Sequence, residues 1–232
     1  MRKYKHVFFD LDRTLWDFDT NSLETIKDLY NIYNIKTILN CDFLSFHTTY
    51  IKYNTQLWDA YRKAEIKKEF LSVQRFLLTL NDFGCNDLTL ASKMAKDYIH
   101  LSPLKSLLFP YTLEVLDFLK DKYCLHIITN GFVEVQYRKI KNAGLEKYFT
   151  HAITSEEAGF QKPDKQIFEF SLEKAGAKAE ESIMIGDDLK IDILGAKQIG
   201  IDQIFFNPSG IQHNEVITFE IDSLKQIFEI LN

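Results

Sequence analysis

The stretch HVFFDLDRTLWDF, residues 6–18, joins a short apolar run to two closely spaced carboxylates. The apolar run at 7–9 has the character of a buried strand, and Asp10 and Asp12 follow it at once. Two closely spaced carboxylates at the end of such a strand do not stabilise a fold, because charged side chains are seldom buried unless they are paired. The stretch therefore predicts a buried strand that carries reactive groups at its carboxyl end.

Two later stretches repeat this arrangement. The apolar run at 125–128 precedes the polar segment 129–131, and the run at 182–185 precedes the polar segment 186–188. Continuous apolar runs followed by helical patterns are typical of buried parallel strands in an α/β protein. Because ligands bind beyond the carboxyl ends of parallel strands, we expect the three polar segments to face one crevice. The pattern also predicts a strand at 203–206 and helices at 133–143, 165–175, 191–199 and 223–231.

The segment between the first two strands carries no such apolar run. Its apolar residues recur at three- and four-residue spacing, as in Leu23, Ile26 and Leu29, which predicts amphipathic helices. We therefore expect an α/β core formed by residues 1–18 and 104–232, and a helical domain formed by residues 19–103. A helical domain rooted directly after the first acidic loop would act as a lid that excludes water and selects substrates.

Composition narrows the function classes. The chain has 232 residues, of which 26% are charged, with a formal net charge of −5. This balance argues against a binder of nucleic-acid polymers, because such binders need a basic surface. The three cysteines are scattered and have no nearby histidines, which indicates a reducing compartment rather than a disulfide framework or a zinc site. No window approaches the roughly 20 apolar residues that span a bilayer, so we expect a cytoplasmic protein without a membrane partner.

The acidic residues at the predicted crevice require a cation. Two unit charges about 4 Å apart repel by about 4 kcal/mol at an effective dielectric of about 20. Oxygen ligands without histidine or cysteine select a hard ion, and few carboxylates with room for water favour Mg²⁺ over Ca²⁺. Lys162 would supply a second, fixed cation. If the loops converge, up to five carboxylates meet there: Asp10, Asp12, Asp187, Asp188 and Asp192.

The remaining polar groups point to a phosphate. A metal ion, a lysine and the donors of Thr129 and Asn130 make a site for an anion with several oxygens. One carboxylate held against a phosphoryl group can attack it, and a second one two residues away can transfer the proton. We therefore expect Asp10 to act as the nucleophile and Asp12 as the acid and then the base.

Four segments, in this order, resemble the four motifs of the haloacid dehalogenase superfamily. They are residues 10–14 (DLDRT), Thr129 with Asn130-Gly131, Lys162-Pro163, and residues 186–192 (GDDLKID). The resemblance spans nearly the whole chain. It implies a Rossmann-like, three-layer α/β core with a parallel sheet, an inserted helical cap of the C1 type, and an aspartyl-phosphate intermediate at Asp10.

The same resemblance implies the roles of individual residues. The Mg²⁺ ligands would be a carboxylate oxygen of Asp10, the backbone carbonyl of Asp12 and the side chain of Asp187. Asp192, and also Asp188 unless it points away from the metal, would orient water or Lys162. Phosphate would be bound by Thr14, Thr129, Asn130, Gly131 and Lys162.

Two positions depart from the family pattern. Position 13 is arginine where the family often has glycine, and position 188 is aspartate where serine or asparagine is common. Neither change removes a catalytic group, but both alter the charge near Asp12. The hydrolytic dehalogenases of the superfamily need no metal and typically lack the counterparts of Asp12 and Asp187. The resemblance is therefore to a phosphatase.

A finer resemblance concerns the substrate. Residues 15–19 (LWDFD) and 54–61 (NTQLWDAY) are similar to the pyrimidine 5′-nucleotidase branch, which favours a nucleoside monophosphate. Phe18, Trp58 and Tyr61 could stack on its base, although packing between cap helices explains Trp58 and Tyr61 at least as well. The alternatives are a 2-haloacid dehalogenase, or a phosphatase or phosphomutase for another small phosphorylated metabolite, such as a sugar phosphate or phosphoglycolate.

Overall fold

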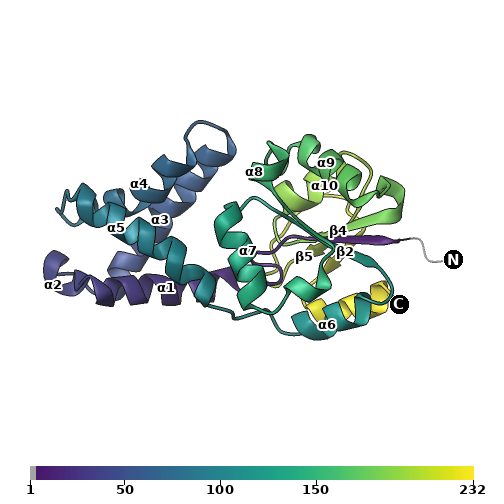
Figure 1. Cartoon of the computed structure of the whole chain (residues 1–232), viewed down its shortest axis with the longest axis horizontal. Helices are drawn as coiled ribbons and strands as arrows, with labels where there is room; N and C mark the ends of the chain where they lie inside the picture. The colour runs from purple at the N-terminus through teal and green to yellow at the C-terminus, as the bar shows by residue number, and fades with distance from the viewer. Residues whose placement is uncertain (1–3) are drawn as a thin grey trace. The chain divides into compact units, whose positions relative to one another are not determined.

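The core of the protein is a parallel sheet of six strands, seen in a computed structural model in which residues 4–232 are described (Figure 1). The order is β3-β2-β1-β4-β5-β6, so the direction of winding reverses between β1 and β4. In such sheets the crevice lies at this reversal, beyond the carboxyl ends of the two strands. The strands are β1 (His6–Phe9), β2 (Cys124–Thr129), β3 (His151–Thr154), β4 (Ser182–Gly186), β5 (Asp202–Phe206) and β6 (Phe219–Ile221).

The predicted strands all form, and two further ones were missed. The missed strands are β3 and β6, at the two edges of the sheet. β3 has only four residues and begins with a histidine, whereas β6 has three residues of which two are exposed. Edge strands of this length do not need a continuous apolar run, because fewer of their side chains are covered.

The strand register brings the ends of β1 and β4 together. Phe9 lies opposite Ile127 on one side and Ile185 on the other, and the N–H of Asp10 donates to the carbonyl of Ile185 at 2.9 Å. Residue 10 therefore lies beside the segment that follows β4, although about 175 residues separate them in sequence.

Helices cover both faces of the sheet (Figure 1). Val7 and Phe9 pack into one core cluster, and Phe8 packs into the cluster on the other face, as the alternation of a strand requires. The first face is covered by α6 (Thr112–Leu119), α7 (Val133–Asn142) and α11 (Ile227–Ile230). The second is covered by α8 (Ser155–Ala158), α9 (Lys165–Ala175) and α10 (Leu194–Lys197). The predicted three-layer α/β fold is confirmed.

Two predicted helices differ in detail. The helix expected at 191–199 begins instead with a π-helical turn, η4 (Leu189–Ile193), before α10. The helix expected at 223–231 is a 3₁₀ turn, η5 (Leu224–Gln226), followed by α11. Two further 3₁₀ turns are η2 (Glu146–Tyr148) and η3 (Ala179–Glu181).

The chain divides into two compact units, residues 1–18 with 106–232 and residues 19–105. Residues 1–3, part of the predicted core domain, lie outside the described residues. Where the chain leaves the first unit and returns to it, Asp17 N donates to Leu107 O at 3.0 Å, and Phe109 N donates to Leu15 O at 2.9 Å. The inserted unit therefore has its two ends held side by side.

The second unit is built of helices around its own core. An apolar face of each long helix meets in one cluster that includes Ile26, Phe46, Phe76 and Met94. Its elements are α1 (Phe18–Ile32), α2 (Ile35–Leu39), α3 (Phe43–Arg62), α4 (Lys68–Asp82), α5 (Leu88–Leu101) and η1 (Ser102–Leu104). Across residues 4–232, none of the helices has both the length and the apolar character needed to cross a bilayer.

Candidate active site

Three carboxylates converge at the reversal point of the sheet. Asp10 follows β1, and Asp187 and Asp192 follow β4, and one ligand oxygen from each lies within 4.8 Å of the others. Gly186 makes this approach possible, because a Cβ there would lie 2.5 Å from the Cβ and from an oxygen of Asp192. The predicted convergence of these acidic groups is therefore present in the fold.

Lys162 lies among these carboxylates and is almost fully buried. Its Nζ is 2.6 Å from an oxygen of Asp10 and 2.6 Å from an oxygen of Asp192, and it donates to Ile128 O at 2.7 Å. A buried ammonium group is costly unless it is paired and hydrogen-bonded, and all these contacts meet that need. The lysine is therefore fixed as a permanent positive charge within the acidic cluster.

Burial first, and crowded negative charge second, raise the pKa values of the aspartates in this cluster. Burial raises the pKa of Asp10 to about 7, against the lowering effect of Lys162. Burial, and then the charges of Asp10 and Asp192, raise the pKa of Asp187 to about 9. Burial also raises the pKa of Asp192, whereas Asp10 and Asp192 raise the pKa of Lys162 although its burial acts in the opposite direction. The cluster therefore favours an additional cation.

Asp12 is held by two residues that sequence reasoning missed. Its Oδ1 accepts from Lys139 Nζ at 2.6 Å, and its Oδ2 accepts from Gln136 Nε2 at 2.8 Å. Both partners lie on α7 and are buried. Their three-residue spacing on a predicted helix directly after the second motif was the available signal, because residues i and i+3 share a helix face.

Asn130 and Thr14 contact other residues of the acidic cluster. The side chain of Asn130 donates to Lys162 O and accepts from Lys162 N, both at 2.8 Å. An amide matches a peptide group in this way because it has one donor and one acceptor. Thr14 is fully buried, and its hydroxyl donates to Asp187 Oδ1 at 3.3 Å. The predicted role of Asn130 and Thr14 in binding phosphate stays a prediction. Both side chains orient charged residues of the cluster.

Asp188 points into the turn that follows it. Its Oδ1 accepts from Lys190 N at 2.9 Å and from Ile191 N at 3.0 Å, so it caps η4. Such capping satisfies backbone donors at the start of a helical turn. Of the two residues expected to orient Lys162, Asp192 is therefore the one that contacts it.

Thr129 and Gly131 form the short polar segment after β2. Thr129 is buried, and its Oγ1 accepts from Gly131 N at 3.1 Å. α7 begins after Phe132 without a side-chain cap, so Thr129 does not cap that helix. Their predicted role in binding phosphate stays a prediction.

The aromatic candidates for substrate contact are divided between the two units. Phe18 packs against the core of the first unit, with its ring centroid 6.2 Å from that of Trp16. Trp58 and Tyr61 lie on α3 in the second unit, half-buried and edge to face at 5.6 Å. Their contact with a substrate stays a prediction.

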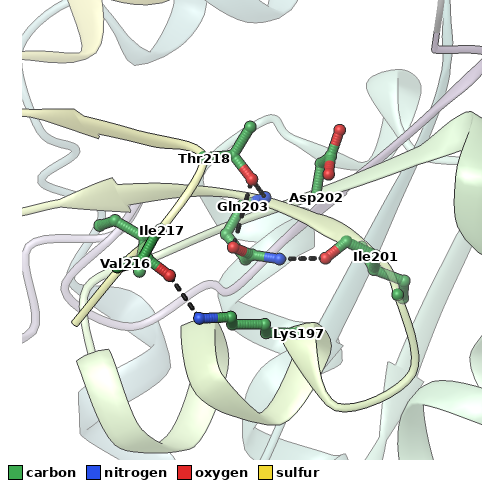
Figure 2. Close-up of a pocket in the computed structure, with 8 residues that line it drawn as sticks. Lys197, Ile201, Asp202, Gln203, Val216, Ile217 and Thr218 are labelled. Atoms are coloured by element: carbon green, nitrogen blue, oxygen red, sulfur yellow. Dashed lines mark hydrogen bonds between the residues drawn. The ribbon is translucent and has the colours of Figure 1, made fainter.

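A separate pocket of about 310 Å³ lies beside the amino end of β5 (Figure 2). Figure 2 shows that its polar groups bind one another: Lys197 donates to Val216 O, and Gln203 is bonded to both Ile201 and Thr218. This end of the strand is opposite the carboxyl edge that carries the acidic cluster. Most polar groups that Figure 2 shows around the pocket are therefore already hydrogen-bonded to one another.

The doubly wound sheet, and the cluster of carboxylates with Lys162 at its reversal point, agree with the class of hydrolase that the four motifs indicate. A family model described as haloacid dehalogenase-like hydrolase matches residues 4–200. The chain therefore belongs to this family of enzymes.

Several known proteins are similar to the chain over nearly its whole length. The HAD-hydrolase YfnB of Bacillus subtilis is 29% identical, with 100% of this chain and 97% of YfnB covered. The pyrimidine 5′-nucleotidase PynA of Streptococcus pneumoniae is 29% identical over 99% of this chain and 95% of PynA. A glyceraldehyde 3-phosphate phosphatase of Pyrococcus furiosus is 30% identical over 100% of this chain and 94% of that enzyme.

Solved structures give the same family. The crystal structure of YfnB bound to magnesium has a TM-score of 0.89 at 26% identity and covers 99% of both chains. A 2-haloacid dehalogenase of Pseudomonas syringae has a TM-score of 0.70 at 27% identity, with 98% of each chain covered. The predicted family and fold are thus confirmed.

Proposed function

We propose that the protein is a Mg²⁺-dependent phosphomonoesterase that acts through an aspartyl phosphate on Asp10. One observation carries the proposal. Ligand oxygens of Asp10, Asp187 and Asp192 lie within 4.8 Å of one another, and the buried Lys162 pairs with Asp10 and Asp192, in a cluster whose raised aspartate pKa values favour another cation.

The donor set fits Mg²⁺. Its acidic oxygens come without histidine or cysteine, which suits a hard cation, and YfnB was crystallised with magnesium. Carboxylate oxygens of Asp10 and Asp187 and the backbone carbonyl of Asp12 would hold the ion. When bound, Mg²⁺ supplies positive charge that favours the approach of a phosphoryl group to Asp10.

Two carboxylates then divide the chemistry. A carboxylate oxygen of Asp10 attacks phosphorus, the bond to the ester oxygen breaks, and the leaving alkoxide takes the proton from Asp12. Asp12 then takes a proton from water, whose oxygen attacks phosphorus and releases inorganic phosphate and the free Asp10 carboxylate. Lys162 balances negative charge throughout, since its Nζ lies 2.6 Å from Asp10.

The substrate class that we favour is a nucleoside 5′-monophosphate, with a pyrimidine base. The support is the similarity to PynA over 99% of the chain, together with the aromatic pair Trp58 and Tyr61 on α3. A small sugar phosphate is the second candidate, because the similarity to a glyceraldehyde 3-phosphate phosphatase is equally extensive. A 2-haloacid dehalogenase remains the third, since a solved dehalogenase shares the fold.

The test is phosphate release from a panel of nucleotides, sugar phosphates and phosphoglycolate, with Mg²⁺ and with EDTA. Asp10→Asn should lower activity by about 10³-fold or more, because the amide cannot form the covalent intermediate. Asp121→Asn, an exposed aspartate after α6, is the matched control and should stay within about twofold of wild type.

Each outcome decides between the candidates. Mg²⁺-dependent release that is highest on pyrimidine monophosphates supports the whole proposal, whereas a preference for sugar phosphates retains the chemistry and changes the substrate class. Chloride release from 2-chloropropionate without Mg²⁺, and no phosphate release, would replace the proposal by the dehalogenase.

A further inference from the structure

We propose that Gln136 and Lys139 are positioning residues that hold Asp12 for proton transfer. The inference rests on the proposed function, because it assigns to α7 the task of orienting the acid and base of that reaction. We call the two side chains the α7 clamp.

The clamp occupies both oxygens of one carboxylate. Lys139 Nζ lies 2.6 Å from Oδ1, and Gln136 Nε2 lies 2.8 Å from Oδ2. Two donors from one helix, on two different oxygens, fix the rotation of the carboxylate as well as its place. Proton transfer requires this degree of alignment, because the group must be within hydrogen-bond reach of the reacting oxygen.

Lys139 is itself immobilised by its surroundings. Only about 2% of the residue is exposed, and its Nζ lies 3.8 Å from the centre of the Trp16 ring and 5.3 Å from that of Phe18. The rings and Asp12 together compensate the burial of the ammonium group. A lysine that served only to anchor α7 would not need burial beside a predicted catalytic carboxylate.

The backbone at Gly131 leaves the space that Gln136 needs. A Cβ at position 131 would lie 1.6 Å from Gln136 Nε2 and 2.4 Å from its Cδ. The absence of a Cβ at this glycine of the second motif therefore allows Gln136 to reach Asp12. This couples the segment after β2 to the carboxylate after β1 through one amide group.

The same amide has an unused acceptor. Gln136 Oε1 is buried and, among the described residues, has no hydrogen-bond partner, although Nε2 of the same group donates to Asp12. A buried acceptor without a partner destabilises a folded protein and is uncommon, so it indicates that a further donor binds there during function. A hydroxyl group that exchanges a proton with Asp12, from the leaving alcohol or from water, has the chemistry to fill it.

The test compares two leaving groups. p-Nitrophenolate departs without a proton, whereas the alkoxide of a sugar or nucleoside needs one from Asp12. The measured quantity is kcat/KM, with Mg²⁺, for p-nitrophenyl phosphate and for the best alkyl phosphate of the panel, because kcat/KM covers the steps through departure of the leaving group. Their ratio is independent of the fraction of protein that is folded.

The variants are Lys139→Met and Gln136→Leu, with Lys141→Met as the control on the same helix. We expect kcat/KM for the alkyl phosphate to fall at least tenfold more than that for p-nitrophenyl phosphate in both clamp variants. Gln136→Leu keeps the Lys139–Asp12 ion pair, so it serves if Lys139→Met folds poorly. Lys141 is exposed, so its variant should leave both values within about twofold.

Equal losses on both substrates, or no loss on either, would overturn the clamp as a positioning device. A wild-type protein that releases no phosphate, or an Asp10→Asn variant with undiminished activity, would instead overturn the proposed function and this inference with it. The two failures are therefore distinguishable in one experiment.

Discussion

Arg13 shows how a single residue departs from its family at a backbone cost. Its φ is 65°, in the left-handed region, where a Cβ is unfavourable and glycine is not. The glycine common at this position in the family therefore matches the backbone that the loop needs. The positive charge of the arginine helps to lower the pKa of Asp187, against the stronger effect of burial. Its guanidinium also lies 4.6 Å from the centre of the Phe18 ring.

Replacing Arg13 by glycine should relieve this strain. We expect Arg13→Gly to be about 1 kcal/mol more stable than Arg13→Ala, since both lack the long side chain and only alanine keeps the Cβ. In a protein of this size that difference corresponds to about 2–4 °C in the thermal midpoint. Scanning calorimetry of the two variants measures it, and equal midpoints would show that the loop relaxes out of the left-handed conformation.

Three histidines stack across neighbouring strands. His126 on β2 lies between His6 on β1 and His151 on β3, with ring centroids 5.4 and 5.5 Å apart. Only about 1% of His126 is exposed, and its Nδ1 has no hydrogen-bond partner among the described residues. Burial, and then the two neighbouring imidazoles, lower the pKa of His126 to about 3. The native sheet therefore keeps this ring neutral.

This stack should make stability depend on pH on the acid side. An unfolded chain protonates position 126 below about pH 6.5, but the native chain does so only near pH 3, so the unfolded state binds more protons between these values. This residue alone should then contribute a decrease in the free energy of unfolding as pH decreases, by up to about 1.4 kcal/mol per pH unit. Because Asp10 and Asp187 contribute a slope of opposite sign, the contribution of His126 is measured as the difference between the slopes of wild type and His126→Phe in urea unfolding between pH 4.5 and 7.5.

His126→Phe should remove this contribution from the slope, because phenylalanine keeps an aromatic ring in the stack without a titrating group. His100→Phe, at an exposed position on α5, is the matched control and should keep the wild-type slope. If His126→Phe has the same slope as wild type, the His126 ring does not contribute to the pH dependence of stability.

At the scale of the whole molecule, the acidic cluster links stability, pH and metal. In the metal-free protein, Asp10 and Asp187 have pKa values of about 7 and 9, against about 4 in an unfolded chain. The native state therefore binds more protons than the unfolded state above pH 4, and its stability should fall as pH rises toward 9. A bound cation would compete with those protons, so Mg²⁺ should bind more tightly at higher pH.

Mg²⁺ should therefore raise the thermal midpoint more at pH 8.5 than at pH 6. At about 100 times its dissociation constant the ion stabilises by about 2.7 kcal/mol, or about 5–10 °C for a chain of this size. Thermal denaturation with Mg²⁺ and with EDTA at both pH values provides the measurement. Asp187→Asn should remove most of the shift and Asp121→Asn none of it; equal shifts at both pH values would contradict the link.

Some strands and site residues were predictable from the sequence and others were not. The buried strands were predictable because a continuous apolar run such as 125–128 is typical of a strand that is covered on both faces. β3 and β6 lie at the edges of the sheet and lack such a run. Of the site residues, Asp10, Asp187 and Lys162 were predictable from type and order. Gln136 was not, because its three-residue spacing from Lys139 is only a weak signal and its partner Asp12 lies 124 residues away.

The sequence by itself determined the order of the four central strands along the chain and the reactive groups at the carboxyl ends of β1, β2 and β4, because both depend on local pattern. Which groups meet was decided by the tertiary structure. The placement of β1 between β2 and β4 brings Asp10 to Lys162 and Asp187, and it leads Asp12 to α7 rather than into the acidic cluster. Such pairings depend on sheet order and on the space left by single glycines, which no local pattern encodes.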